Sequence, residues 1–185
     1  MSEVEKRTYV EQIDLEPLPI LHLTHPKLTV PPDPFDFDAP EQIDPAEFSN
    51  RMFQKMRNMG GVGLAANQLG LNYRMFVFGD EQTQINVFNP RIVAVSDETW
   101  LFKEACLSFP GFELTLRRPK TVTSSYQTET GEIKVQTFSG LAGRIFLHEC
   151  DHVVLGINFM MYASKFKLDH ELRKWKKQQQ KKYRR

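Results

Sequence analysis

Two histidines and a glutamate lie together in the segment HECDH, residues 148–152. Residues four apart on a helix share a face, so His148 and His152 can bind one metal ion from the same side. Glu149 stands beside them and, without being a ligand, can take a proton from water and pass it to a leaving group. The segment predicts metal-assisted hydrolysis, while a chance HExxH match on a charged helix remains the competing interpretation.

A third ligand is expected because a catalytic metal ion usually takes three protein ligands and keeps one position open. Downstream of the histidines the candidates are Asp169, His170 and Glu171, all in a basic tail. Upstream, Cys106 in KEACLSFP would complete a site of one thiolate and two imidazoles. Taken without its neighbours, Cys106 is better explained as a small buried apolar residue.

A glycine-rich segment, GVGLAANQ, occupies residues 61–68. Glycines let the backbone come close to a ligand, and the side-chain amide of Gln68 can donate a hydrogen bond to a developing oxyanion. By itself the segment is better explained as a tight turn between a helix and a strand.

Capping and periodicity predict the first element that positions these groups. The tract 31–45 holds five prolines and is expected to be mostly loop. Asp44 can cap a helix in which Pro45 takes the first turn, and Glu47 completes a capping box. One face of this helix carries the apolar residues Phe48, Met52, Met56 and Met59, expected in the core, and Gly60 and Gly61 end it.

Between residues 73 and 136 the pattern changes to short β-type runs, RMFVFG, INVFN, RIVAVS, TVTSSYQ and EIKVQ, with a hairpin turn at Thr130 and Gly131. Residues 139–155 then return to a helical pattern, with Ser139 as the candidate cap. The apolar contacts of this helix are expected from Ile145, Phe146, Val153 and Val154. The order of a helix, several strands, a helix and a tail predicts an α+β fold.

Length and composition fit one globular domain. The chain has 185 residues, of which 41% are hydrophobic and 25% charged, which excludes disordered and fibrous classes but does not choose between an enzyme and a binding protein. No apolar run approaches the ~20 residues of a membrane span, and the first residues are too acidic for a signal or transit peptide. Two cysteines are expected to be thiols, and the protein is expected in the cytoplasm.

Together and in this order, the three motifs resemble the peptide deformylase family. The family patterns GxGLAAxQ, EGCxS and QHExDHxxG stand here as GVGLAANQ, EACLS and LHECDHVVLG. PILHLTHPKL also resembles the family's opening strand, and FNPRI its INP strand. The resemblance covers about Leu18 to Ser164 and implies antiparallel or mixed sheets packed around a central HExxH helix. It divides the chain into an arm, 1–17, a catalytic domain, 18–164, and a basic tail, 165–185, helical at its start.

The resemblance implies removal of the N-formyl group from the terminal formylmethionine of nascent peptides, with release of formate. Glu149 would be the general acid and base, and Gln68 with the backbone N–H of Leu107 would hold the oxyanion. The implied metal ligands are Cys106, His148 and His152. Ferrous iron is the ion that the family implies, although Cys and His ligands also suit zinc, nickel and cobalt.

The resemblance also implies the surroundings of the reacting groups. Backbone at Val62, Gly63 and Ala105 would pair with an extended peptide, which is recognition by strand addition. Glu104 and Arg118 would form an ion pair that orients the loop carrying the cysteine ligand. An ordinary surface pair is the alternative explanation of Glu104 and Arg118.

Several positions depart from the family pattern. Ala105 stands where the family has glycine, which costs activity if that residue needs a positive φ or a close approach of substrate. Leu147 replaces a glutamine. Three residues instead of two separate His152 from Gly156, so the helix end is expected to be reshaped after the ligands. Cys150 is expected to point away from the histidines and to pack in the core.

From Ser164 onward ten Lys or Arg face two acidic residues, a balance of +8, which leaves −7 for residues 1–163. The simplest interpretation is a solvated amphipathic helix anchored by Leu168, Leu172 and Trp175. The alternative is contact with ribosomal RNA, since polybasic segments bind phosphate backbones. A monomer without a membrane partner is expected.

Two other functions remain open from the residues. One is a zinc endopeptidase of the HExxH type with Glu171 as third ligand. The other is a deformylase-like protein that binds formyl-peptide ends or RNA without turnover because of Ala105.

Overall fold

The computed structural model describes residues 13–39 and 43–182. Its strands form two antiparallel sheets. The larger has the order β1-β2-β3-β6-β7, with bounds Gly63–Ala65, Met75–Gly79, Gln84–Val95, Thr121–Gln127 and Ile133–Ser139. The smaller pairs β4, Thr99–Ala105, with β5, Glu113–Pro119. The predicted α+β fold is confirmed, with both sheets wholly antiparallel in the described residues.

Helix α1, Pro45–Asn58, begins and ends where local signals predict. The carboxylate of Asp44 accepts hydrogen bonds from the backbone N–H groups of Ala46 and Glu47, both at 2.9 Å. Phe48, Met52 and Met56 are buried against β1 and β2, but Met59 is 44% exposed. The core position predicted for Met59 is wrong, because the helix ends before it and Gly60 turns the chain at φ +72°.

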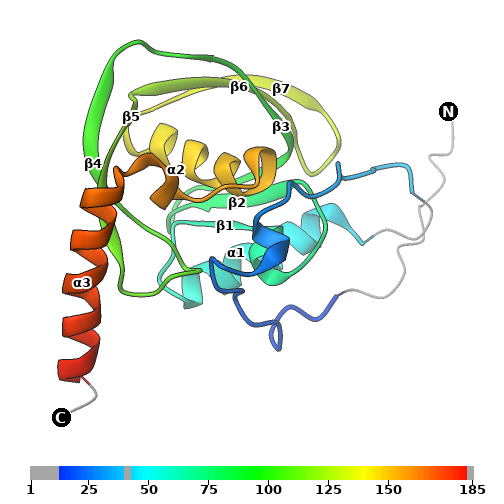
Figure 1. Cartoon of the computed structure of the whole chain (residues 1–185). Helices are drawn as coiled ribbons and strands as arrows, with labels where there is room; N and C mark the ends of the chain where they lie inside the picture. The colour runs from blue at the N-terminus through cyan, green and yellow to red at the C-terminus, as the bar shows by residue number, and fades with distance from the viewer. Residues whose placement is uncertain (1–12, 40–42, 183–185) are drawn as a thin grey trace, which may run out of the picture.

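Helix α2, Gly140–Cys150, lies between β6–β7 and β1–β2, so that the larger sheet curves around it (Figure 1). Phe146 is fully buried, and its ring stacks on Phe138 of β7 at 4.8 Å. Ser139 caps the helix by position, without a side-chain hydrogen bond. This helix is therefore held on two sides, which fixes the direction of the side chains that it carries.

A π-helical segment, Asp151–Leu155, continues α2 and ends at Gly156 with φ +62°. A π turn contains one residue more than an α turn, so it accommodates an inserted residue without changing the helix before it. The reshaped helix end predicted from the extra residue before Gly156 is present. Its predicted place after both histidines is wrong, because the π-helical segment starts at Asp151 and includes His152, so only His148 precedes it.

Several strands differ from the prediction. The runs INVFN and RIVAVS join in one strand, β3, whose register shifts between Phe88 and Arg91 around Asn89. Strands β4 and β5 were not predicted, because their buried positions include the charged Glu104 and Arg118 where an apolar pattern would be expected. The turn at Gly131, with φ +81°, joins β6 and β7 as predicted.

The segment PILHLTHPKL is not a strand. It makes isolated hydrogen bonds, such as Leu21 N–H to the carbonyl of Gln68 at 2.7 Å, and ends in a short 3₁₀ helix, Pro26–Leu28. The N–H groups of Leu21 and Leu23 bond to separate segments, at Gln68 and Ser108, so no ladder forms. Residues 13–18, which precede this segment, also pack on the core, and Leu15 is buried there. The rest of the predicted arm, 1–12, lies outside the described residues.

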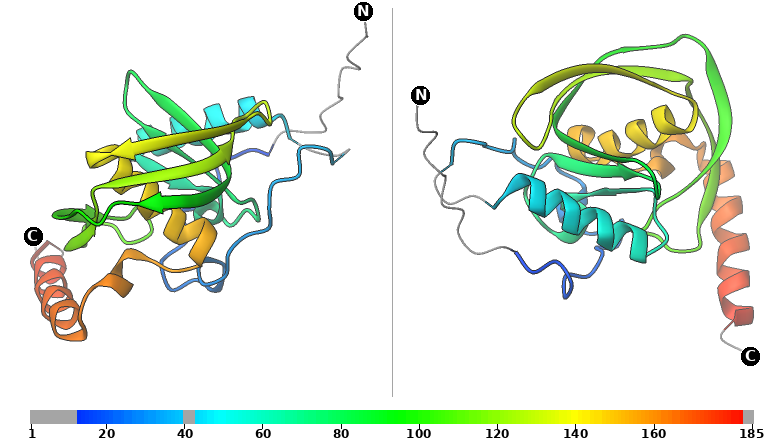
Figure 2. Two further views of the ribbon diagram at one scale, coloured as in Figure 1. Left: turned by 90° about the horizontal axis from the view of Figure 1, so that it is seen from above. Right: turned by 180° about the vertical axis from the view of Figure 1, so that it is seen from behind.

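Two short 3₁₀ helices and a long helix complete the chain: η2, Ala66–Leu69, η4, Phe159–Tyr162, and α3, Lys165–Lys182. Helix α3 lies at the edge of the molecule beside β5 (Figure 2). Its apolar side chains Leu168, Leu172 and Trp175 pack on a cluster that includes Phe109 and Phe112. No helix in the described part of the chain is long and apolar enough to cross a membrane.

Candidate active site

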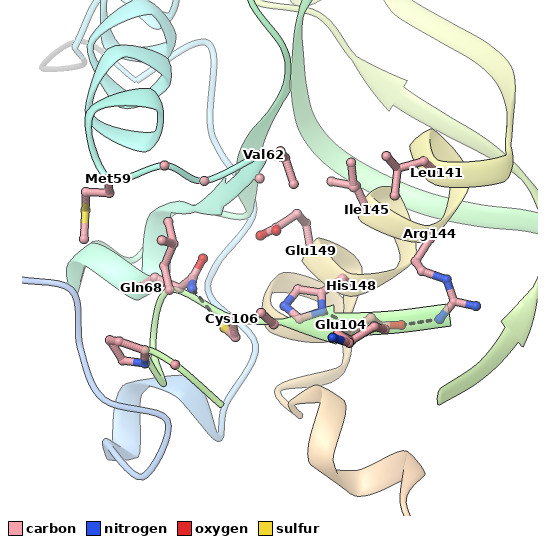
Figure 3. Close-up of a pocket in the computed structure, with 18 residues that line it drawn as sticks. Met59, Val62, Gln68, Glu104, Cys106, Leu141, Arg144, Ile145, His148 and Glu149 are labelled. Carbon is pink, nitrogen blue, oxygen red and sulfur yellow. Dashed lines mark hydrogen bonds and ion pairs between the residues drawn. The ribbon is translucent and has the colours of Figure 1, made fainter. Parts of the chain in front are cut away.

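A pocket of about 500 Å³ opens where the end of α1, β1, β4 and α2 meet (Figure 3). It brings together groups that lie far apart in the sequence. Of the functional residues predicted from the sequence, those that line it are Val62, Gly63, Gln68, Glu104, Ala105, Cys106, Leu107, His148 and Glu149. His152 and Arg118 are buried behind these residues.

Cys106, His148 and His152 form a compact cluster of ligand atoms. The cysteine sulfur and one atom of each imidazole all lie within 4.8 Å of one another, and Sγ is 3.4 Å from Nε2 of His152. No other group of three such ligands occurs in residues 13–39 and 43–182. Glu171, the alternative third ligand, lies on α3 and pairs with Lys174 at 3.2 Å.

A hydrogen bond leaves one nitrogen of His148 free where an ion would need it, whereas Nδ1 of His152 has no hydrogen-bond partner. Nδ1 of His148 lies 2.9 Å from the Glu104 carboxylate, so it carries the proton and Nε2 is left with its lone pair. Nε2 of His152 faces the sulfur, and Asn67 donates to the His152 carbonyl at 2.7 Å, which holds this turn of the backbone. A thiolate and two imidazoles so placed fit a divalent transition metal.

The protonation of the two imidazoles differs because their neighbours differ. Burial and the nearby His148 lower the pKa of His152 to about 3, so this ring is neutral near pH 7. Burial also disfavours the charged form of His148, but hydrogen bonds to Cys106 and Glu104 outweigh burial and raise its pKa well above the usual value. A metal ion and a proton therefore compete for His148.

Glu104 is the centre of a buried ionic network. Arg118 donates to both its carboxylate oxygens, at 2.6 and 2.8 Å, and also to Asp151 at 2.8 Å. Arg144 donates to Oε1 of Glu104 at 2.6 Å, the oxygen that also accepts from Nε of Arg118. Burial raises the pKa of Glu104, but hydrogen bonds from His148 and Arg118 outweigh it and hold the pKa at about 2. Glu104 is therefore ionised, as an acceptor for His148 must be.

Sequence reasoning missed Arg144 and Asp151. A signal for Arg144 existed: it precedes His148 by four residues, so it shares the helix face that carries the first histidine. Asp151 lies inside HECDH, but its partners could not be predicted from the motif. They are Arg118 and Tyr162, which lie on other elements of the fold.

Glu149 lies in the pocket beside this cluster. Its side chain is buried, and one carboxylate oxygen, Oε2, has no hydrogen-bond partner. Burial raises the pKa of Glu149 to about 7. A carboxylate with a pKa near the working pH can both accept and return a proton, which is what a general acid and base requires.

Gln68 faces the cluster from η2, on the other side of the pocket (Figure 3). Its Oε1 accepts from the backbone N–H of Ala65 at 2.8 Å, which turns the amide nitrogen toward Ser108 Oγ at 3.0 Å and Cys106 Sγ at 3.5 Å. The amide is thus oriented with its donors toward the ligand sulfur.

Comparison with known proteins identifies the family. A family model described as polypeptide deformylase matches residues 17–169. The chain belongs to the peptide deformylase family. It is similar to the peptide deformylase of Bartonella henselae, with 36% identity over 160 residues, 81% of this chain and 90% of that protein. The match to the enzyme of Thermotoga petrophila is 39% over 103 residues, 56% of this chain, and spans 63% of that relative's length.

Solved structures agree. A plant peptide deformylase superposes with a TM-score of 0.80 and 32% identity, covering 94% of both chains. A peptide deformylase from Synechococcus elongatus, in complex with actinonin, gives a TM-score of 0.77 at 28% identity and covers 91% of this chain and 90% of that one.

The departures from the deformylase pattern are structurally mild. The only non-glycine residue with a positive φ in the described part of the chain is Asn89, so Ala105 carries no left-handed strain. Leu147 is buried on the α2 side that faces the sheet, among apolar neighbours. Cys150 is 1% exposed in the same cluster, and burial raises the pKa of its thiol well above the usual value, which suits an inert packing residue.

Proposed function

We propose that this protein removes the N-formyl group from the terminal formylmethionine of nascent peptides by metal-dependent hydrolysis, releasing formate. The observation that carries the proposal is Glu149, a buried carboxylate with a free oxygen, in the same pocket as the Cys106 and His148 ligand atoms. Family membership supports the same reaction.

Cys106, His148 and His152 are proposed to hold the ion, with Glu104 and Arg118 orienting His148. A divalent ion held there supplies positive charge that polarises the formyl carbonyl and lowers the pKa of water. Ferrous iron is the proposed ion in the cell; zinc, nickel and cobalt suit the same ligands.

Glu149 then moves the proton. It accepts a proton from water as the water oxygen bonds to the formyl carbon, and it returns that proton to the amine nitrogen as the carbon–nitrogen bond breaks. The products are formate and a free amino terminus. The Gln68 amide and the backbone N–H of Leu107 are proposed to donate to the oxygen on which negative charge develops.

The substrate peptide is proposed to pair with β1, which is an edge strand of the larger sheet. The carbonyl of Val62 already accepts from Gly79 N–H at 3.0 Å, so the trans peptide bond turns Gly63 N–H the other way, toward the open edge. Ala105, at the end of β4, lines the facing side of the pocket. An extended peptide fits between these two edges.

Formate release from formyl-Met-Ala-Ser by iron-loaded protein, kept anaerobic, tests the function. We expect the wild-type protein to release formate and the Glu149→Ala variant to release none. A wild-type protein that binds the ion and the peptide but releases no formate would reject the proposal in favour of a deformylase-like binding protein. The endopeptidase alternative is not favoured, since the ligand atom that clusters with those of His148 and His152 belongs to Cys106 and not to Glu171.

We further propose that the tail contacts ribosomal RNA and that the protein acts as a cytoplasmic monomer. Helix α3 is anchored by apolar residues on one side and exposes lysines such as Lys176, Lys177 and Lys181 on the other, and the free thiols suit a reducing compartment. Replacing these three lysines by glutamate keeps the anchors and should abolish salt-sensitive co-sedimentation with ribosomes. Co-sedimentation that survives this change, or deletion after Lys167, would exclude the tail.

A further inference from the structure

Arg144 lines the pocket as a buried cation, and the proposed reaction gives it no task. It is 2% exposed, on α2, and its guanidinium lies 4.8 Å from the centre of the Trp100 ring. Burying a charge is costly unless it is paired and hydrogen-bonded, and an apolar side chain would often pack there equally well. A buried arginine at this position therefore calls for an explanation beyond packing.

The contacts of Arg144 join the helix to both strands of the smaller sheet. Nη2 donates to the backbone carbonyl of Trp100 on β4 at 2.8 Å, and Nη1 reaches the carbonyl of Leu116 on β5 at 3.3 Å. Nη1 also donates to Glu104 at 2.6 Å (Figure 3). One side chain thus fixes α2 against β4 and β5 through three acceptors.

These elements are the ones that carry the metal ligands. His148 follows Arg144 by one helical turn on α2, whereas Cys106 comes directly after the last residue of β4. Arg118 makes a second link between the sheet and the helix. It lies on β5 and donates to Asp151, which precedes His152 in the segment that continues α2. The two arginines therefore link the helix and the smaller sheet in opposite directions, and both donate to Oε1 of Glu104.

We infer that Arg144 is a positioning residue of the metal site: through Glu104 and the β4 backbone it sets the distance and orientation of His148 relative to Cys106. The inference rests on the proposed metal site but not on the reaction performed there. Arg118 holds Glu104 from β5, and the other bond from α2 to this carboxylate comes from His148, the ligand that has to be oriented. Arg144 supplies a bond from the helix to Glu104 that does not pass through the ligand.

The test measures binding of cobalt(II) to the metal-free protein, by visible absorption in competition with a chelator. Arg144→Met keeps the length and removes the donors, and it should lower cobalt affinity by about 10- to 100-fold, the usual effect of losing a partner of a metal ligand. Arg144→Lys keeps the charge and should recover part of the loss. Arg117→Met is the matched control and should bind cobalt as wild type does. Arg117 is exposed on β5, and among the described residues it hydrogen-bonds only to the Thr99 side chain on β4.

The spectrum provides a second reading, because the ligand-field and thiolate bands of bound cobalt report the geometry that Arg144 is inferred to set. Cobalt affinity and spectrum equal to wild type in the folded Arg144→Met protein would overturn the inference, even if the variant were less stable to urea. Should Arg144→Met fail to fold, Arg144→Lys decides alone. The two proposals can fail separately. If the variants bind cobalt weakly but the wild-type protein releases no formate, the proposed reaction is rejected and the inference about Arg144 stands.

Discussion

Replacing Gly63 with alanine should displace the Glu149 carboxylate, the proposed general acid and base, without touching the proposed metal ligands. A Cβ added at Gly63 would lie 2.3 Å from Oε1 of Glu149, 2.9 Å from its Cδ and 3.0 Å from Cγ2 of Ile145. Glu149 is only 4% exposed, so its carboxylate cannot swing into solvent. Relief of the contact requires the carboxylate to retreat by roughly 1 Å from the place where it meets water and substrate.

A misplacement of that size costs about 100-fold in rate, or about 2.7 kcal/mol of activation free energy. We expect kcat for formate release from formyl-Met-Ala-Ser to fall by this factor in Gly63→Ala. The affinity for cobalt should stay at the wild-type value, because the added methyl group meets only Glu149 and Ile145 among its nearest neighbours. Measuring both quantities separates a displaced base from a damaged metal site.

Gly140→Ala is the matched control. Gly140, unlike Gly63, has a positive φ, +57°, and no atom lies within 4 Å of an added Cβ, so this variant loses about 1–2 kcal/mol of stability to backbone strain but leaves the pocket alone. A kcat for Gly63→Ala within about threefold of that of Gly140→Ala would refute the reasoning, since the carboxylate would then tolerate the methyl group.

Three further outcomes are expected. Cys106→Ser should weaken cobalt binding by on the order of 100-fold or more, because a hydroxyl is a poor replacement for a thiolate; retention of the ion would point to Glu171 instead. Chelation should stop formate release, and added ferrous iron should restore it; activity that persists in the metal-free protein would contradict the mechanism. In urea unfolding, Met52→Ala should lose about 2–5 kcal/mol, because Met52 is fully buried, whereas Met59→Ala, at a half-exposed position, should change stability by less than about 0.5 kcal/mol; equal losses would contradict the assigned burial.

The elements that depend on local signals could be read from the sequence. Asp44 and Pro45 start α1, Gly131 turns β6 into β7, and the four-residue spacing of His148 and His152 places both on one side of a helix. Each of these depends on hydrogen bonds or sterics within a few residues, so no knowledge of distant contacts is needed. The family motifs added the roles of residues that local signals could not connect.

Local sequence signals did not predict the strands that bury charged residues, or the segment whose hydrogen bonds go to separate partners. Strands β4 and β5 bury Glu104 and Arg118, so their alternation does not look apolar, and only their pairing with each other and with Arg144 makes those positions stable. The opening segment around Leu21 resembles a strand but finds no partner ladder.

The site itself depends on which elements meet. By itself the sequence determined the ligand types and the helical spacing of the two histidines, because both follow from residue identity and helix geometry. Only the tertiary structure decided that Cys106 reaches them while Glu171 does not, and that Arg144 links the helix to the strand before Cys106. The physical reason is that these are long-range contacts, and the burial that raises the pKa of Glu149 to about 7 exists only once the sheet has closed around α2.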